Sequence, residues 1–346
     1  MDIHKPGTQI SELGEFGLID HLTAGFTVNN KSSVVGIGDD AAVLDFKGNL
    51  TVISTDLLTE GIHFNLMYTP LRHLGYKSVI VNLSDIYAMN AIPRQITFSM
   101  AVSAKFSVED LEELYAGVEE ACDKYGIDLV GGDTTSSMTG LTLSVTATGE
   151  ARKEDLVFRS GAKPTNLLCV TGDLGGAYMG LQLLERENEV FKVNPLTTPK
   201  LEGYEYILRR QLRPEARRDI VEAFSEMKIR PTSMIDISDG LSSEILHLCK
   251  SSGVGCLLFE DRIPIDQQTK TMAGEFSINP LVSALNGGED YELLFTLPVE
   301  FYEKIKNDPD FTVLGYITPA EEGVRLKTTG GSEIPLQAQG WNPLKG

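Results

Sequence analysis

Short apolar runs that are typical of β-strands alternate with helical patterns along the whole chain, and the spacing between them is irregular. The first runs, at 34–38, 41–46 and 51–56, are separated by Gly and Asp residues that are typical of turns. A doubly wound sheet would require regularly repeated β-α-β units, so the pattern favours an α+β fold. The length of 346 residues suggests two mixed αβ domains, which we expect over 1–150 and 151–346.

The first domain is predicted to continue with a long helix over 71–91, ended by Pro93, and with a strand over 96–102. Ser107 and Asp110 form an S-x-x-D capping signature before a second helix, whose apolar residues recur at helical spacing. These residues are Leu111, Leu114, Tyr115, Val118 and Cys122. Two further strand patterns, DLVGGD and LTLSVTATG, complete the first domain.

The second domain is predicted to begin with a strand over 167–172, which leads through the Gly-rich segment DLGGA into a helix over 176–187. We interpret Gly175 and Gly176 as sites of close helix packing and not of phosphate binding. The polar stretch 188–205 contains two prolines and predicts a loop. Further helices are expected at 214–228 and 241–251, and further strands at 233–238, 255–259, 291–297, 312–317 and 324–328.

Acidic residues outnumber basic ones, 49 against 30, so the formal net charge is −19. This excess argues against nucleic acid or an anionic membrane as a partner. No apolar run approaches the ~18 residues of a membrane-spanning helix, and the first residues lack the pattern of a secretory signal. Four widely spaced cysteines without a CxxC pair predict buried, reduced thiols. We therefore expect a cytoplasmic protein.

A group of acidic residues differs from the surface background, because its members lie in Gly-, Ser- or Thr-rich turns beside apolar strands. They are Asp39, Asp40, Asp56, Asp85, Asp133, Asp236, Asp239, Glu289 and Asp290. A carboxylate at the end of an apolar strand is costly unless a cation or donor pairs with it. Few basic residues lie near them in sequence, and hard divalent ions such as Mg²⁺ suit carboxylates and hydroxyls.

Each of these acidic motifs has a simpler structural reading. A single GGD or SDG is more often a turn or a helix N-cap than a metal ligand. Asp39 and Asp40 are compatible with an Asx-turn, and Asp85 with a hydrogen-bonded residue inside a helix. The repetition of such motifs in one chain nevertheless favours a site that holds several metal ions.

The segment GIGDDA also matches the loose G-x-G-x-x-A pattern of dinucleotide-binding loops. That pattern requires a following helix, whereas AAVLDF is typical of a strand, and two aspartates in the loop would repel a phosphate. The sequence also contains no GxxxxGK[ST] motif. If the protein uses ATP, metal ions must therefore mediate the binding of its phosphates.

Eight motifs in a fixed order resemble the thiamine-monophosphate kinases, a family of the aminoimidazole ribonucleotide synthetase-like ATP enzymes. They are ELGEF, GIGDDAAV, STDLLTEGIHF, VNLSDIYAM, VGGDTT, RSGAKP, DISDGLSSEI and GGEDYELLFT, and they extend from Glu12 to Phe295. The resemblance implies transfer of the γ-phosphoryl group of ATP to thiamine monophosphate, which gives thiamine diphosphate. It also implies a homodimer whose N-terminal sheets meet, with the active site between the two domains.

The same resemblance assigns roles to individual residues. Metal ligands are implied at Asp40, Ser54, Thr55, Asp56, Asp85, Asp133, Asp236 and Asp239. Contacts with ATP are implied at Tyr115, Gly132, Arg159 and Ser238, and contacts with the substrate at His63, Glu289 and Trp341. Without the resemblance, His63 reads as a structural histidine and Arg159 equally as a partner in an ion pair. The tail GWNPLKG departs from the family ending GW-x-HF, which leaves the role of Trp341 open.

Phosphoryl transfer between two anions needs positioning and charge neutralisation more than covalent help, and bridging metal ions supply both. We therefore expect direct transfer, without a phosphoenzyme and without a catalytic side chain. The alternatives are another ATP-using enzyme of the same superfamily and a non-catalytic divalent-cation-binding relative. Selenophosphate synthetase and the hydrogenase-maturation dehydratase fit less well, because they require a cysteine near the N-terminus and at the C-terminus, respectively. Here the first cysteine is Cys122 and the chain ends in Lys345–Gly346.

Overall fold

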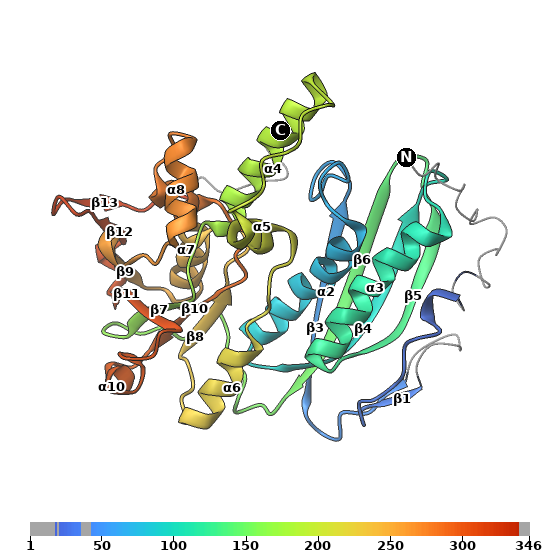
Figure 1. The fold of residues 1–346 in the computed structure, drawn as a ribbon. Helices are drawn as coiled ribbons and strands as arrows, with labels where there is room; N and C mark the ends of the chain where they lie inside the picture. Colours follow the sequence, from blue (N-terminus) through green and yellow to red (C-terminus); the bar gives the residue numbers. More distant parts are fainter. Residues whose placement is uncertain (1–17, 19–20, 36–42, 339–346) are drawn as a thin grey trace. The chain divides into compact units, whose positions relative to one another are not determined.

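The computed structural model describes residue 18, residues 21–35 and residues 43–338, and within them the chain forms two compact units. The N-terminal unit comprises the described residues up to Ile86 together with Ala91–Glu154, and the C-terminal unit comprises Tyr87–Asn90 and the described residues from Asp155 onward. Both units combine helices with a mixed sheet, which confirms the α+β prediction (Figure 1). Among the described helices, none is both long and apolar enough to cross a membrane.

A four-stranded sheet forms the centre of the N-terminal unit, in the order β3-β6-β4-β5. Its strands are β3 (Leu50–Thr59), β6 (Leu141–Ala151), β4 (Ile92–Val102) and β5 (Asp128–Ser136), and β1 (Ser33–Val35) pairs separately with β2 (Val43–Leu44). Neighbours in the sheet are antiparallel except for β4 and β5. Every second residue of β6 is buried, which shows that one face of the sheet carries the core.

Two helices, α2 (Leu71–Ala88) and α3 (Val108–Tyr125), lie side by side over that face (Figure 1). The predicted capping box of α3 is confirmed, because Ser107 accepts from the backbone N–H of Asp110 and the Asp110 carboxylate accepts from that of Ser107. The first helix ends earlier than predicted. Pro93 lies inside β4 and does not terminate the helix.

The sheet of the C-terminal unit has the order β13-β12-β9-β11-β7-β10-β8. Its strands are β7 (Leu167–Thr171), β8 (Ser233–Asp236), β9 (Gly255–Phe259), β10 (Leu293–Leu297), β11 (Phe311–Thr318), β12 (Val324–Lys327) and β13 (Glu333–Pro335). Leu168 and Val170 belong to one buried cluster, while Cys169 between them belongs to another. Since successive strand residues point to opposite faces, this sheet is buried on both sides.

The helices of the C-terminal unit are α4 (Gly176–Val193), α5 (Glu205–Leu212), α6 (Arg218–Met227), α7 (Leu241–Ser252), α8 (Gln267–Glu275), α9 (Pro280–Asn286) and α10 (Tyr302–Ile305). Short 3₁₀ turns lie at η1 (Glu260–Arg262), η2 (Val299–Phe301) and η3 (Ala320–Glu322). All four cysteines are buried and form no disulfide, as predicted.

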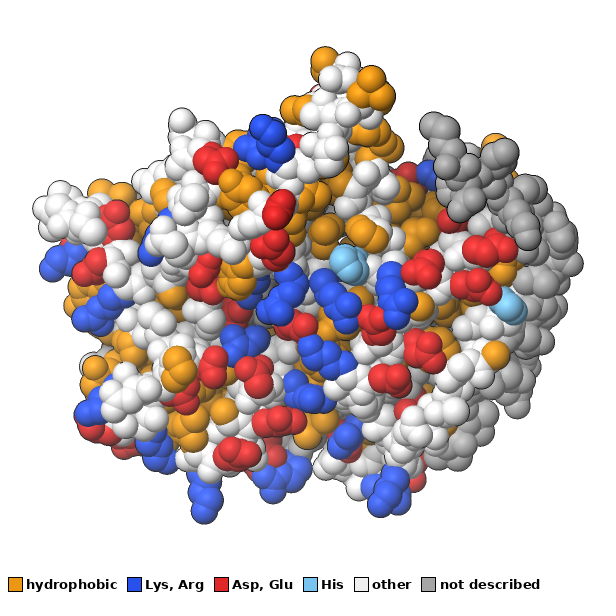
Figure 2. All heavy atoms as spheres, in the orientation of Figure 1, with side chains coloured by type: hydrophobic (Ala, Val, Ile, Leu, Met, Phe, Trp, Pro, Cys, Tyr) orange, Lys and Arg blue, Asp and Glu red, His pale blue; other side chains and the backbone are white. Residues whose placement is uncertain are grey.

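The prediction of a loop over 188–205 is wrong at its beginning, because α4 continues to Val193. The last part of this helix projects from the unit and exposes apolar side chains (Figures 1 and 2). Those with the largest exposure are Val193 at 87% and, just after the helix, Leu196 at 94%. Residues 189–193 at the end of α4 are exposed, and a solvent-exposed helix end need not show an amphipathic pattern, so periodicity could not reveal it.

Candidate active site

Two carboxylates and a hydroxyl come together between β3 and α2 in the N-terminal unit. Asp56 is the register partner of Val145, a fully buried residue on the helix-covered face of the sheet. Ser54, two residues earlier on the same face, donates its hydroxyl to the Asp85 carboxylate on α2. The pKa of Asp56 is raised to about 6, mainly by burial and to a smaller extent by the charge of Asp85. Two acids held in this way favour a shared proton or a bound cation.

Thr55, between Ser54 and Asp56, points to the other face of the sheet. Its hydroxyl donates to the backbone carbonyl of Val145 at 3.1 Å and accepts from the Thr146 hydroxyl at 3.0 Å. The structure therefore brings together three of the predicted metal ligands, and it separates the Thr55 hydroxyl from them.

Two predicted site residues lie on β5, at Gly132 and Asp133. Gly132 is the register partner of Phe98, and a Cβ atom at Gly132 would lie 1.9 Å from the Phe98 carbonyl oxygen. Only glycine fits at that position. Asp133 is exposed and is the register partner of Ser99. Across the sheet it is therefore in register with Leu57, the residue that follows Asp56 on β3. Within the described residues, no three acidic, histidine or cysteine side chains already form a metal-binding group.

Tyr115 and His63 both have structural contacts. The ring of Tyr115 is 8% exposed and packs edge-on against Phe98 at 5.3 Å, and burial raises its pKa to about 12. The backbone N–H of Thr59 donates to Nδ1 of His63 at 3.1 Å. This bond places the proton of the neutral His63 imidazole on Nε2.

In the C-terminal unit, the structure brings the loop after β8 against the segment before β10. The Glu289 backbone N–H donates to the Ser238 carbonyl at 2.7 Å, and that of Tyr291 donates to the Ile237 carbonyl at 2.9 Å. Ser238, assigned to ATP, therefore lies beside Glu289, assigned to the substrate. The two residues are distant in sequence, and only the fold makes them neighbours.

The two predicted aspartates of this segment differ in exposure, because Asp236 is buried and Asp239 is exposed. Asp236 is 4% exposed at the end of β8, opposite Leu293. Burial raises the pKa of Asp239 above its usual range, while His247 and Arg159 act in the opposite direction. Arg159 thus lies near one of the predicted metal ligands. The predicted residues Asp40 and Trp341 lie outside the described residues.

Sequence reasoning missed a buried acid beside this loop. Glu244 on α7 is 2% exposed, and its carboxylate accepts from the Asp239 backbone N–H at 3.0 Å. Burial is the main cause that raises its pKa to about 8. The glutamate that follows DISDGLSS was the available signal, since a carboxylate in the first turn of a helix commonly bonds to free backbone N–H groups.

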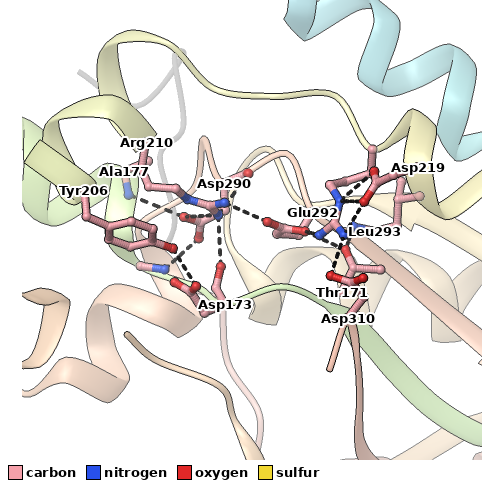
Figure 3. A network of polar contacts seen from close by, with 12 residues as sticks. Thr171, Asp173, Ala177, Tyr206, Arg210, Asp219, Asp290, Glu292, Leu293 and Asp310 are labelled. Carbon is pink, nitrogen blue, oxygen red and sulfur yellow. Dashed lines mark hydrogen bonds and ion pairs between the residues drawn. The ribbon is translucent and has the colours of Figure 1, made fainter. Parts of the chain in front are cut away.

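Sequence reasoning also missed a polar network around the turn that contains Glu289 (Figure 3). Asp290 occupies the N-terminus of α4, where it accepts from the backbone N–H groups of Gly175 at 2.7 Å and Ala177 at 3.4 Å. This contact agrees with the interpretation that the DLGGA glycines do not bind phosphate. Two arginines, Arg210 and Arg217, bind the buried carboxylate of Glu292. The three acids in GGEDYELLF were the visible sign, but the arginines that bind two of them come from α5 and from the residue before α6.

Residues 38–151 match the family described as AIR synthase related protein, N-terminal domain. The chain is 33% identical over 341 residues to the thiamine-monophosphate kinase of Bacillus subtilis (strain 168), and the alignment covers 96% of this chain and 100% of that protein. The chain belongs to the thiamine-monophosphate kinase family.

Two solved structures support this assignment. The thiamine-monophosphate kinase from Stenotrophomonas maltophilia K279a has a TM-score of 0.77 and 31% identity, with 90% of this chain and 96% of that chain covered. A structure described as AaThiL complexed with AMPPCP and TMP has a TM-score of 0.75 and 32% identity, with 98% of this chain and 100% of that chain covered. The family resemblance inferred from the ordered motifs is thus confirmed.

Proposed function

We propose that this protein transfers the γ-phosphoryl group of ATP to thiamine monophosphate and releases thiamine diphosphate and ADP. The observation that carries the proposal is the likeness to thiamine-monophosphate kinases over nearly the whole chain, including a relative solved with AMPPCP and TMP. The reaction is a kinase reaction with a phosphate oxygen as the acceptor. We further propose that it takes place in the cytoplasm.

Magnesium is the proposed metal, and the residues in the N-terminal unit fit it. Asp56, Asp85 and Ser54 offer hard oxygen ligands, and burial, followed by the charge of Asp85, raises the pKa of Asp56, so a bound cation would stabilise its charged form. The other proposed ligands are Asp40, Asp133, Asp236 and Asp239, whereas the Thr55 hydroxyl points to the opposite face of the sheet and is not proposed as a ligand. When bound, Mg²⁺ would supply the positive charge that brings two anionic phosphates together.

The chain itself would position the reactants. Arg159 carries a charge that complements ATP phosphates, with Gly132, Ser238 and Tyr115 as the other proposed ATP contacts. His63, Glu289 and Trp341 are proposed to bind thiamine monophosphate. Since the acceptor is already a phosphate oxygen, no side chain has to remove a proton, and direct in-line transfer is expected. After reaction with labelled ATP, no ³²P should remain on the protein.

A homodimer is proposed in which the N-terminal sheets of two copies meet. The face of the sheet opposite α2 and α3 exposes Ile53 at 65% and Leu57 at 57%, both on the edge strand β3. Apolar side chains on an open sheet edge are a common site of pairing with a second chain.

The purified chain should convert ATP and thiamine monophosphate to thiamine diphosphate in the presence of Mg²⁺, and chelation of Mg²⁺ should stop the reaction. Asp56→Asn should abolish turnover, whereas Asp123→Asn, at an exposed position of α3, should leave it unchanged. Absence of product at all tested Mg²⁺ and K⁺ concentrations would refute the proposed function.

A further inference from the structure

The turn that carries Glu289 has an unusual backbone. Glu289 has a φ of 57° and Tyr291 a φ of 52°, and Gly288 before them has a φ of 71°. Residues with a side chain rarely adopt this left-handed region, so contacts outside the turn must hold it. The segment is therefore the place where a supporting network would affect the orientation of Glu289.

Asp290 holds the turn from one side. Its side chain is buried and bonded to the start of α4, as described above, and it also lies 3.4 Å from Nη2 of Arg210. The same Nη2 donates to the Asp290 carbonyl at 3.2 Å and to the Asp173 carbonyl at 2.9 Å. One guanidinium group therefore binds both the backbone and the side chain of the turn (Figure 3).

Glu292 holds the turn from the other side. Its carboxylate accepts hydrogen bonds from Nη1 of Arg210 at 2.7 Å and from the Thr171 hydroxyl at 2.6 Å. Nη1 of Arg217 donates a third hydrogen bond to the same carboxylate. Arg210 thus bridges the residues on both sides of Tyr291. Burial raises the pKa of Glu292, but the two arginines and Thr171 outweigh it, so the net pKa is lowered and the carboxylate is charged at neutral pH.

The helix that provides Arg210 also contacts Glu289 directly. Gln211, the next residue on α5, donates its side-chain N–H to the Glu289 carboxylate at 3.0 Å. Glu289 is in turn bonded through its backbone to Ser238. Helix α5 therefore connects the turn, the Glu289 carboxylate and the loop after β8.

We propose that Arg210 is a positioning residue for the substrate: through Asp290 and Glu292 it fixes the turn so that the Glu289 carboxylate faces thiamine monophosphate. The kinetic part of this proposal rests on the proposed function. Arg210 touches neither reactant and acts through Glu289. A lysine would keep the charge but could not bridge Asp290 and Glu292, because only a guanidinium group has the required fork of donors.

Arg210→Lys should raise the KM for thiamine monophosphate about tenfold while changing the KM for ATP by less than about twofold. Arg209→Lys, on the exposed side of the same helix, is the matched control and should behave as wild type. If Arg210 acts through Glu289, Arg210→Lys should add little further loss to Glu289→Gln, so the two effects should be strongly non-additive. Additive effects, or an equal rise in the KM of both substrates, would overturn the proposal.

A second measurement needs no activity and separates this proposal from the proposed function. In the full chain without ligands, hydrogen exchange of the Glu289 and Tyr291 amides should become faster in Arg210→Lys and stay unchanged in Arg209→Lys. If Arg210→Lys does not fold, Glu292→Gln, which removes the charge at nearly the same volume, should give the same local acceleration. Unchanged exchange at both amides would refute the positioning role even if wild-type protein makes no thiamine diphosphate.

Discussion

Gly117 in α3 is a sensitive test of the packing in the N-terminal unit. A Cβ atom at Gly117 would lie 1.9 Å from the Arg72 carbonyl oxygen on α2, and one at Gly75 would lie 1.9 Å from the Leu114 carbonyl oxygen. Because real Cβ atoms keep at least 3.0 Å from such atoms, Gly117→Ala must move the two helices apart by about 1 Å.

The expected cost follows from what has to move. Overpacking of a core costs about 1–3 kcal/mol, and the upper end applies here because backbone atoms, unlike side chains, cannot rotate away. Alanine regains about 1 kcal/mol of helix propensity relative to glycine. We therefore expect Gly117→Ala to lower the free energy of unfolding of this unit by about 2 kcal/mol.

Gly274 in α8 provides the matched control, since a Cβ atom there would have no neighbour within 4 Å. Gly274→Ala should stabilise its own unit by about 0.5–1 kcal/mol. The chain has two units, so hydrogen exchange of the α3 amides should be measured beside urea unfolding. A Gly117→Ala variant whose α3 amides are as protected as those of wild type would refute the close-packing argument.

Three further outcomes are expected in the N-terminal unit. Adding Mg²⁺ should raise the Tm of the purified chain, as measured by calorimetry, and a chelator should reverse the rise. A Tm that does not depend on Mg²⁺ would contradict the metal assignment. The affinity for Mg²⁺ should fall as the pH drops through about 6, because the proton competes for Asp56. In the metal-free protein the pKa of Asp56 is raised from 3.8 to about 6, so the folded state binds more protons than the unfolded state in this pH interval. The contribution of Asp56 to stability should therefore fall as the pH rises from about 4 to about 6. Asp85→Asn should weaken this pH dependence, as measured by unfolding at several pH values.

Local signals along the chain predicted much of the fold. The predicted helix at 241–251 corresponds to α7 over Leu241–Ser252, and the predicted strand at 51–56 is the centre of β3. These elements have strong periodicity or clear turn residues at their ends. Helices α5, α8 and α9 were not predicted, because each is short and depends on packing against neighbours that are distant in sequence.

The candidate site also combines features that the sequence predicted with features that only the fold decided. The acidic motifs themselves are visible in the sequence, and their order was sufficient to indicate the family. Which acids meet was not visible: Asp56 and Asp85 lie together, whereas Asp133 lies in a neighbouring row of the sheet. That outcome depends on strand register, which is decided by pairing across the sheet, and on the packing of α2, which carries Asp85, against β3.

By itself, the sequence determined the α+β class, the excess of acid and the ordered motifs that identify the family, since these depend on residue types and local spacing. Tertiary structure alone decided that Glu289 lies beside Ser238 and that Arg210 connects Asp290 with Glu292. The physical reason is that a buried carboxylate must find its donors wherever the fold brings them. No local pattern around GGEDYELLF could show that those donors come from α5 and the segment before α6.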